Sequence, residues 1–169
     1  DLSVKVGYVF QNPDLQILED TVFDEVAYGL KCKKMTEGII KKQVADALTA
    51  MGLEDLVDAY PRALSFGQKR RLGVAAALAL QPRTLILDEI TNGQDEQEKE
   101  DMMAYLRKLN EEKKITIILI THDMNIARKF TKRVLVLNDG NLVFDGATHD
   151  LFDGKNNIEQ WGLKQPVLS

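Results

Sequence analysis

One stretch near the middle of the chain, residues 63–95, constrains the fold most: ALSFGQKRRLGVAAALALQPRTLILDEITNGQD. Ser65 is a good N-cap, and apolar residues recur after it at helical spacing, so a helix is expected to begin there. The apolar run LIL at residues 85–87 has the composition of a strand buried on both faces. Because open parallel sheets bind ligands at the carboxyl ends of their strands, Asp88 and Glu89 are expected at a binding edge.

Both ends of this stretch suit charged ligands. A helix start offers free main-chain N–H groups to an anion, and Gly67 beside the hydroxyl of Ser65 lets an anion come close. The adjacent carboxylates of Asp88 and Glu89 suit a metal ion and a general base. Taken singly, Ser65 is explained as a helix cap and the acids as a strand ending at solvent. Their arrangement along the chain is more specific than either feature.

Two other runs have strand character. Residues 4–10 form a short β-rich run that ends at Gln11, before a loop. Residues 115–120, ITIILI, form a continuous apolar run that His122 follows closely. If the sheet is parallel, His122 reaches the same edge as the two acids.

Apolar residues at helical spacing predict three further helices, one beginning at Asp20-Thr21, one spanning Thr36–Met51 and one spanning about Glu96–Lys113. The second of these is expected to bury a stripe made of Ile39, Ile40, Val44, Ala47, Leu48 and Met51. The third is expected to turn Met102, Met103, Leu106 and Leu109 inward.

The last third of the chain contains a hairpin pattern. Strand-like runs at residues 134–137 and 142–144 flank the turn NDGN at residues 138–141. From Gly146 onwards a short helix is expected, with His149 at the surface.

Composition limits the classes of protein to which the chain can belong. Its 169 residues, 44% of them hydrophobic, are enough for one globular domain with a core. A net charge of −4 without a long basic block argues against a nucleic-acid surface. Its one cysteine, Cys32, excludes an internal disulfide.

Together the motifs resemble the nucleotide-binding domain of ABC-type ATPases. LSFGQ at residues 64–68 matches the family's signature motif, and LILDE at residues 85–89 matches the Walker B strand with its catalytic glutamate. NGQD at residues 92–95 matches the D-loop, Gln11 the Q-loop glutamine and His122 the switch histidine.

The resemblance implies an α/β fold, the three-layer P-loop NTPase domain with a mostly parallel sheet and a helical signature subdomain. Residues from about 12 to 80 would form that subdomain, inserted in a catalytic core made of residues 1–11 and 81–169. Residues 10–30, FQNPDLQILEDTVFDEVAYGL, are most similar to the energy-coupling-factor branch, whose transporters import vitamins and transition-metal ions. The variants SFGQKRRL and NGQD look like the second half of tandem ABC proteins in that branch.

By the same resemblance, the signature side of the domain would act on an ATP held by a second ABC ATPase domain, in a head-to-tail dimer. Ser65, Gly67 and Gln68 would bind its γ-phosphate. Asp95 would connect the two sites across the dimer. The family's other partners are a transmembrane coupling subunit and a substrate-binding membrane protein, which place the ATPase at the cytoplasmic face of the membrane.

The remaining site residues are assigned to hydrolysis by resemblance. Asp88 would hold Mg²⁺ through water, and Gln11 would complete the shell around the metal and the attacking water. Glu89 would polarise that water, and His122 would stabilise charge on the γ-phosphate. The complete protein is thus expected to be an ATP hydrolase that drives uptake of a vitamin or metal ion.

The chain departs from the common family pattern at two motifs. Phe66 replaces a glycine of the signature, which restricts the backbone angles and adds bulk beside the phosphate site. The sequence ITNGQD at residues 90–95 replaces the usual PTAGLD.

The phosphate loop G-x-x-x-x-G-K-[ST] does not occur in these 169 residues. The one Gly-Lys pair, Gly154-Lys155, has His149 in place of the first glycine and Asn156 in place of Ser or Thr. The chain is therefore interpreted as an N-terminally truncated ABC domain that is inactive alone. The coding sequence upstream is expected to carry the motif within about 60 residues of Gln11.

Two other functions remain open. In one, this half is non-catalytic and only supplies its signature motif to a partner's ATP site; the presence of Glu89 and His122 speaks against it. In the other, the protein is a non-transport ABC ATPase that works on ribosomes or DNA. The acidic net charge and the sequence around Gln11 speak against that function.

The truncation predicts low stability for the 169 residues alone. In the family, the absent strand lies inside the sheet, and each buried backbone group left unpaired costs about 1–3 kcal/mol against a total stability of about 5–15 kcal/mol. Circular dichroism during heating is expected to show a broad transition, unless the absent segment or a partner is supplied. A cooperative transition at ordinary temperature contradicts this prediction.

Overall fold

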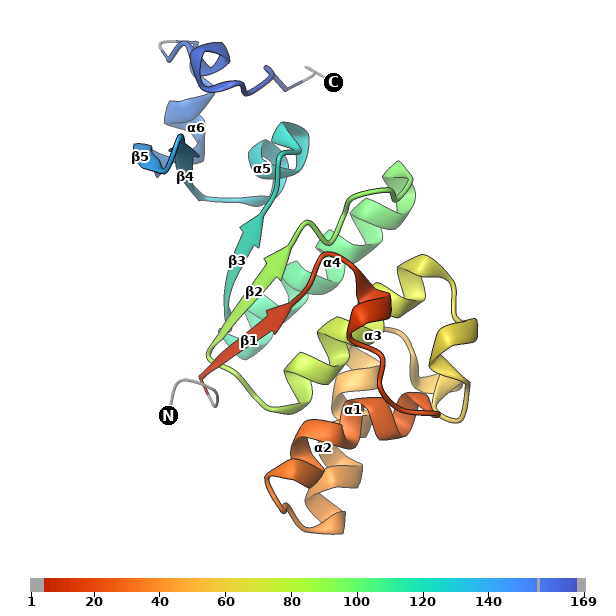
Figure 1. The fold of residues 1–169 in the computed structure, drawn as a ribbon. Coiled ribbons are helices and arrows are strands. Elements are labelled where there is room, and N and C mark those ends of the chain that lie inside the picture. The colour runs from red at the N-terminus through yellow and green to blue at the C-terminus, as the bar shows by residue number, and fades with distance from the viewer. Residues whose placement is uncertain (1–4, 155, 167–169) are drawn as a thin grey trace. The chain divides into compact units, whose positions relative to one another are not determined.

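The computed structural model describes residues 5–154 and 156–166. The chain forms two compact units, divided between residues 120 and 121. Figure 1 shows strands flanked by helices in the first unit and a small hairpin with short helices in the second.

The first unit contains β1 (Val6–Val9), α1 (Val22–Cys32), α2 (Glu37–Ala50), α3 (Phe66–Ala79), β2 (Thr84–Asp88), α4 (Glu96–Lys113) and β3 (Thr116–Ile120). Short 3-10 turns lie at Pro13–Leu15, Glu54–Leu56 and Pro61–Ala63. The second unit contains α5 (Met124–Phe130), β4 (Arg133–Asn138), β5 (Asn141–Ala147), α6 (Thr148–Leu151) and a 3-10 turn at Ile158–Trp161.

The three strands of the first unit form a parallel sheet in the order β1-β2-β3. Tyr8 is aligned with Ile86, and Ile86 is aligned with Ile118. Since all three strands run in the same direction, their carboxyl ends meet at one edge, as Figure 1 shows. The predicted α/β fold with a parallel sheet is confirmed.

The two faces of this sheet differ in burial. Leu85 and Leu87 are completely buried on one face, on which Gly7 lies close to α3. On the other face Ile86 is only half-buried and Ile118 is 44% exposed. The prediction that residues 85–87 are buried on both faces is therefore wrong for Ile86, because the helices of this unit that pack on the sheet cover the opposite face.

The predicted helices form with small corrections. α1 begins where expected, because Thr21 Oγ1 accepts a hydrogen bond from the Asp24 main-chain N–H at 3.0 Å. α2 follows Thr36 and buries its expected stripe, except for Ile39, which is 43% exposed. Ile40 and Val44 define the buried line, and Ile39 lies about 100° around the helix from Ile40.

The second unit is organised around its hairpin. β4 and β5 pair antiparallel, and Asp139 (φ 48°) and Gly140 (φ 76°) form the connecting turn. Left-handed backbone at both central residues is what a tight hairpin turn requires, so the NDGN prediction is confirmed. The small core of this unit consists of Val136, Leu151 and Ile158. His149 is exposed as expected, but its helix begins at Thr148, because β5 continues to Ala147.

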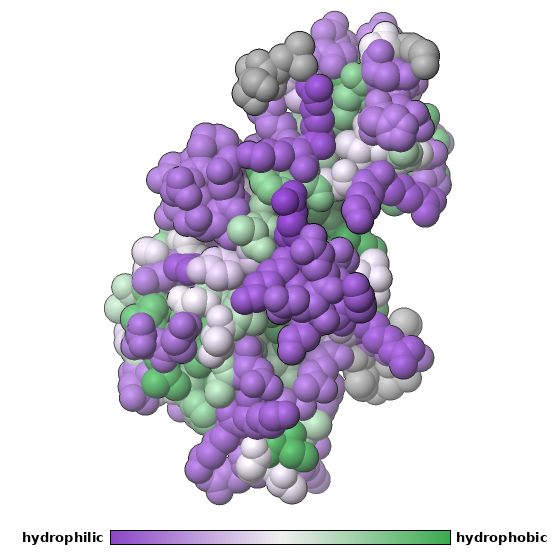
Figure 2. All heavy atoms as spheres, turned by 180° about the vertical axis from the view of Figure 1, so that it is seen from behind, coloured by the Kyte–Doolittle hydropathy of each residue, from purple (hydrophilic) through white to green (hydrophobic). Residues whose placement is uncertain are grey.

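The face opposite to the view of Figure 1 is mostly polar. Figure 2 shows hydrophilic side chains over much of the rear face, with smaller hydrophobic areas between them. In the parts of the chain that the structure describes, no helix combines the length and apolar composition needed to cross a membrane. Cys32 is exposed.

Candidate functional site

The start of α3 is a complete capping box. The Ser65 Oγ accepts a hydrogen bond from the Gln68 main-chain N–H at 3.2 Å, and the Gln68 side chain accepts one from the Ser65 N–H at 2.9 Å. Gly67, between them, is buried, and a Cβ there would lie 3.1 Å from the Glu98 Oε1. The Glu98 side chain would have to shift by a few tenths of an ångström to make room for a Cβ at position 67.

Phe66 occupies the first position of α3. It is absent from the described residues with positive φ, so the bulk of the side chain does not strain the backbone there. The ring is 44% exposed, and the Arg70 guanidinium lies 4.4 Å from its centre. Phenylalanine restricts the backbone angles, but Phe66 adopts ordinary helical backbone, which that restriction allows. Its ring lies against Arg70.

The two acids after β2 lie at the carboxyl edge of the sheet. Asp88 ends β2, and its Oδ2 accepts a hydrogen bond from the Tyr8 hydroxyl at 2.8 Å. Glu89 has left-handed backbone (φ 50°), and its N–H donates to the Ile120 carbonyl at the end of β3 at 2.9 Å. Sequence reasoning missed Tyr8, although its place on the same sheet face as Asp88 follows from the strand register.

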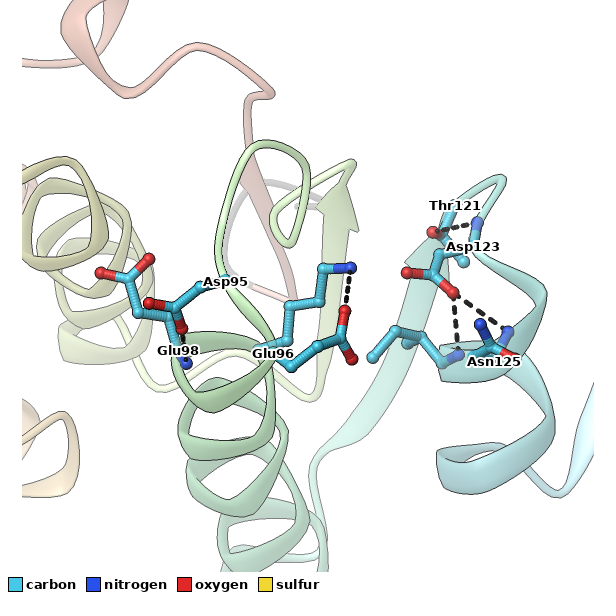
Figure 3. A network of polar contacts seen from close by, with 8 residues as sticks. Asp95, Glu96, Glu98, Thr121, Asp123 and Asn125 are labelled. Carbon is cyan, nitrogen blue, oxygen red and sulfur yellow. Dashed lines mark hydrogen bonds and ion pairs between the residues drawn. The ribbon is translucent and has the colours of Figure 1, made fainter. Parts of the chain in front are cut away.

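A turn connects Glu89 to α4. The Asn92 N–H donates to the Glu89 carbonyl at 3.1 Å, which closes the turn. Asp95 then caps α4, because its Oδ1 accepts from the Glu98 N–H at 2.8 Å, as Figure 3 shows. Asp95 is thus held at the start of α4, one short turn after Glu89.

Three segments that are far apart in the sequence line one open pocket of about 460 Å³. They are the loop after β1, the start of α3 and the turn before α4, contributing Gln11, Asn12, Asp14, Phe66, Arg70, Asn92 and Gly93. An ion pair at 2.9 Å between Lys69 Nζ and Asp14 Oδ1 connects the first two segments. The structure therefore brings Gln11, the signature motif and the D-loop together within the first unit.

His122 belongs to the second unit and is exposed. It lies between Thr121, whose Oγ1 accepts from the Asp123 N–H at 3.0 Å, and Asp123 itself. Asp123 caps α5 by accepting from the main-chain N–H groups of Asn125 at 3.0 Å and Ile126 at 3.2 Å, as Figure 3 shows. Both turns fix the backbone on either side of the histidine.

The donor set of the first unit fits a hard divalent cation such as Mg²⁺. The side chains of Asp88, Glu89 and Gln11 all offer oxygen ligands, and Tyr8 holds one oxygen of Asp88 in place. Within residues 5–154 and 156–166 no group of three or more His, Cys, Asp or Glu side chains could hold a metal ion. Mg²⁺ takes one or two carboxylates and completes its shell with water and phosphate.

Comparisons with known proteins point to one family. Residues 1–92 match the family model described as ABC transporter. The chain is 45% identical to a putative ABC transporter ATP-binding protein of Methanosarcina acetivorans, over 98% of this chain and 27% of that protein. It is 39% identical to the energy-coupling factor transporter ATP-binding protein EcfA2 of Clostridium perfringens, over 100% of this chain and 60% of that protein.

Solved structures agree with the family model. CbiO1 from Clostridium perfringens, described as part of the ABC transporter complex CbiONQ, matches with a TM-score of 0.84 and 36% identity, over 93% of this chain and 62% of that one. A dimeric ATP-binding cassette in a post-hydrolysis state with bound ADP and Pi matches with a TM-score of 0.73 and 33% identity, over 85% of this chain and 63% of that one. The chain thus spans 27% of the M. acetivorans relative's length and about three fifths of the others.

The contact between Tyr8 and Asp88 is testable by titration. The hydrogen bond to Asp88, with smaller contributions from desolvation and from the carboxylate's charge, raises the pKa of the Tyr8 phenol above its usual value of about 10. The Tyr8 signal is the part of the tyrosinate absorbance that disappears in Tyr8→Phe. It is therefore expected to titrate above about pH 10, and its midpoint is expected to return toward that value in Asp88→Asn. An unshifted titration in both backgrounds contradicts the contact.

Proposed function

The chain belongs to the ABC transporter family, and from this premise we propose that it forms the ATP-hydrolysing domain of a membrane transporter. The observation that carries the proposal is the pocket of the first unit, in which Gln11, Phe66 of the signature motif and Asn92 of the D-loop meet. These segments are the ones that the family uses around nucleotide. The capped start of α3 and the two acids after β2 complete the set.

In this proposal the start of α3 binds the γ-phosphate of an ATP held by a second ABC domain. Ser65 and Gly67 lie where the free N–H groups and the positive end of the helix dipole attract an anion. Gln68 holds the Ser65 main chain through the capping box, so the phosphate meets a preformed surface. Asp95, fixed at the start of α4, is the residue proposed to reach across the dimer. The dimeric cassette structure supports such an arrangement.

Hydrolysis is assigned to the edge of the parallel sheet. Asp88, oriented by Tyr8, is the residue proposed to hold Mg²⁺ through water, with Gln11 as the second oxygen donor. The ion supplies charge neutralisation on the phosphates. Glu89 is proposed to accept the proton of the attacking water, and His122 to stabilise charge on the γ-phosphate. Closure of two such domains around ATP would drive a conformational change in the coupled membrane subunits.

We assign the transporter to the energy-coupling-factor type, with a vitamin or transition-metal ion as its cargo. The likeness to EcfA2 and to CbiO1 of the CbiONQ complex supports this branch. Its partners would be a second ATPase domain, a transmembrane coupling subunit and a substrate-binding membrane protein, with the domain at the cytoplasmic face. We retain residues from about 12 to 80 as the signature subdomain, inserted in a core made of residues 1–11 and 81–169.

Replacing the proposed base tests hydrolysis directly. In the full-length protein, Glu89→Gln is expected to lower kcat for ATP about 10²- to 10⁴-fold, because the amide cannot accept the proton. Nucleotide affinity, measured by titration calorimetry, is expected to stay unchanged. Glu96→Gln is the matched control, since Glu96 is exposed, pairs with Lys99 on the surface of α4, and is expected to retain wild-type kcat. Equal rates of phosphate release in wild type and Glu89→Gln would refute the proposed role.

Changing Ser65 separates its capping role from its role in phosphate binding. Asp and Asn both cap helices well, so Ser65→Asp and Ser65→Asn are expected to melt near the wild-type temperature. A carboxylate repels phosphate, so Ser65→Asp alone is expected to lower ATP turnover, by about 10²-fold or more. If Ser65→Asp abolishes turnover while Glu89→Gln does not, this half is a non-catalytic donor of the signature motif. Wild-type turnover in Ser65→Asp excludes the phosphate site.

A further inference from the structure

Arg70 is a buried cation close to the proposed water-activating residue. It lies on α3, one turn after Phe66, and is 3% exposed. Its Nη1 donates a hydrogen bond to the main-chain carbonyl of Ile90, the residue directly after Glu89. Its Nε has no hydrogen-bond partner among the described residues. Burial of a partly satisfied guanidinium is costly, so other interactions of Arg70 must offset part of that cost.

The guanidinium lies against one aromatic ring, and the charges of two carboxylates act on it. The Phe66 ring covers it at 4.4 Å from the ring centre. Burial lowers the pKa of Arg70, and the charges of Glu89 and Glu98 oppose that effect. The ring, the guanidinium and the Ile90 carbonyl therefore form one connected chain of contacts from the signature motif to the segment that carries Glu89.

The backbone of Glu89 needs such support. A residue with a Cβ costs about 1–2 kcal/mol in the left-handed region that Glu89 occupies. Its own N–H is fixed by Ile120 at 2.9 Å, and its carbonyl closes the turn by accepting from Asn92 at 3.1 Å. Arg70 holds the next peptide, at Ile90, and so fixes the direction in which the chain leaves Glu89.

We propose that Arg70 is a positioning residue, which, covered by Phe66, fixes the main chain after Glu89 and connects the phosphate-binding start of α3 to the water-activating carboxylate. The inference rests on the proposed function, because it acts through Glu89. It also assigns a use to the phenylalanine that replaces the family's glycine: the ring covers the buried cation and excludes water from its hydrogen bond.

The test compares two neighbouring arginines of α3 in the full-length protein. Arg70→Met is expected to lower kcat for ATP at least ~10-fold with KM within about twofold, since misplacing a reacting group affects the chemical step. Arg70→Lys keeps the positive charge and a donor group but not the planar contact with the ring, and is expected to give an intermediate kcat. Arg71→Met is the control, because Arg71 contacts the Met51 carbonyl and the Tyr105 hydroxyl instead and is expected to retain wild-type kcat.

A double variant separates positioning from a general structural effect. If Arg70 acts through Glu89, Arg70→Met with Glu89→Gln is expected to be no slower than Glu89→Gln alone. Hydrogen exchange of the amides from Glu89 to Gln94 is expected to accelerate in Arg70→Met and to stay unchanged in Arg71→Met. Should Arg70→Met fail to fold, the lower kcat of a folded Arg70→Lys supports the proposal, and an undiminished kcat overturns it.

The remaining outcomes distinguish a failure of the positioning role of Arg70 from a failure of the proposed function. Wild-type kcat in Arg70→Met, or a full additional loss in the double variant, overturns the positioning role and leaves the proposed function intact. Wild-type kcat in Glu89→Gln overturns the proposed base, and the role of Arg70 with it.

Discussion

Because β1, β2 and β3 run parallel and in register, three separate parts of the chain end at one edge of the sheet. The loop containing Gln11 leaves β1 there, and Asp88 and Glu89 leave β2 there. The N–H of Glu89 bonds to the last carbonyl of β3, so β3 also sets the direction of the acidic segment. The site depends on this pairing, since Gln11, the acidic pair and the end of β3 are far apart in the sequence.

Helix α3 brings the proposed binding surface for the second domain's ATP to the same unit. Its capping box presents Ser65 and the first free N–H groups in a fixed geometry. Lys69 binds Asp14 of the loop after β1, and Arg70 binds the carbonyl after Glu89. Two consecutive basic residues thus connect one helix to both neighbouring segments of the site. A displacement of α3 would therefore shift both the loop after β1 and the segment after Glu89.

Much of this arrangement was predictable from local patterns in the sequence. Ser65 as a cap, the helix of residues 96–113 and the turn at Asp139-Gly140 depend on short-range chemistry, and all three are confirmed. Burial was less predictable, because apolar composition does not tell which strand face a helix covers. Ile118 is exposed for that reason, whereas Ile39 is exposed because it lies about 100° around α2 from the buried Ile40.

The contacts that no local pattern indicates are those between distant residues. The Tyr8 hydroxyl meets Asp88 across 80 positions, and Arg70 meets the Ile90 carbonyl across 20. Only the strand register and the packing of α3 bring these atoms together. The family resemblance identified the motifs at Gln11, Glu89 and His122, but it did not predict which residues of this chain contact them.

The most direct test of the central claim is a structure of the full-length protein with a non-hydrolysable ATP analogue and Mg²⁺. In a dimer with a second ABC domain, the γ-phosphate of that domain's ATP is expected at the start of α3, within hydrogen-bond distance of Ser65 and the Gly67 N–H. Asp88, Glu89 and Gln11 are expected around the metal and water of the ATP held in their own half. A bound nucleotide that touches neither the start of α3 nor the edge at Asp88 would contradict the account.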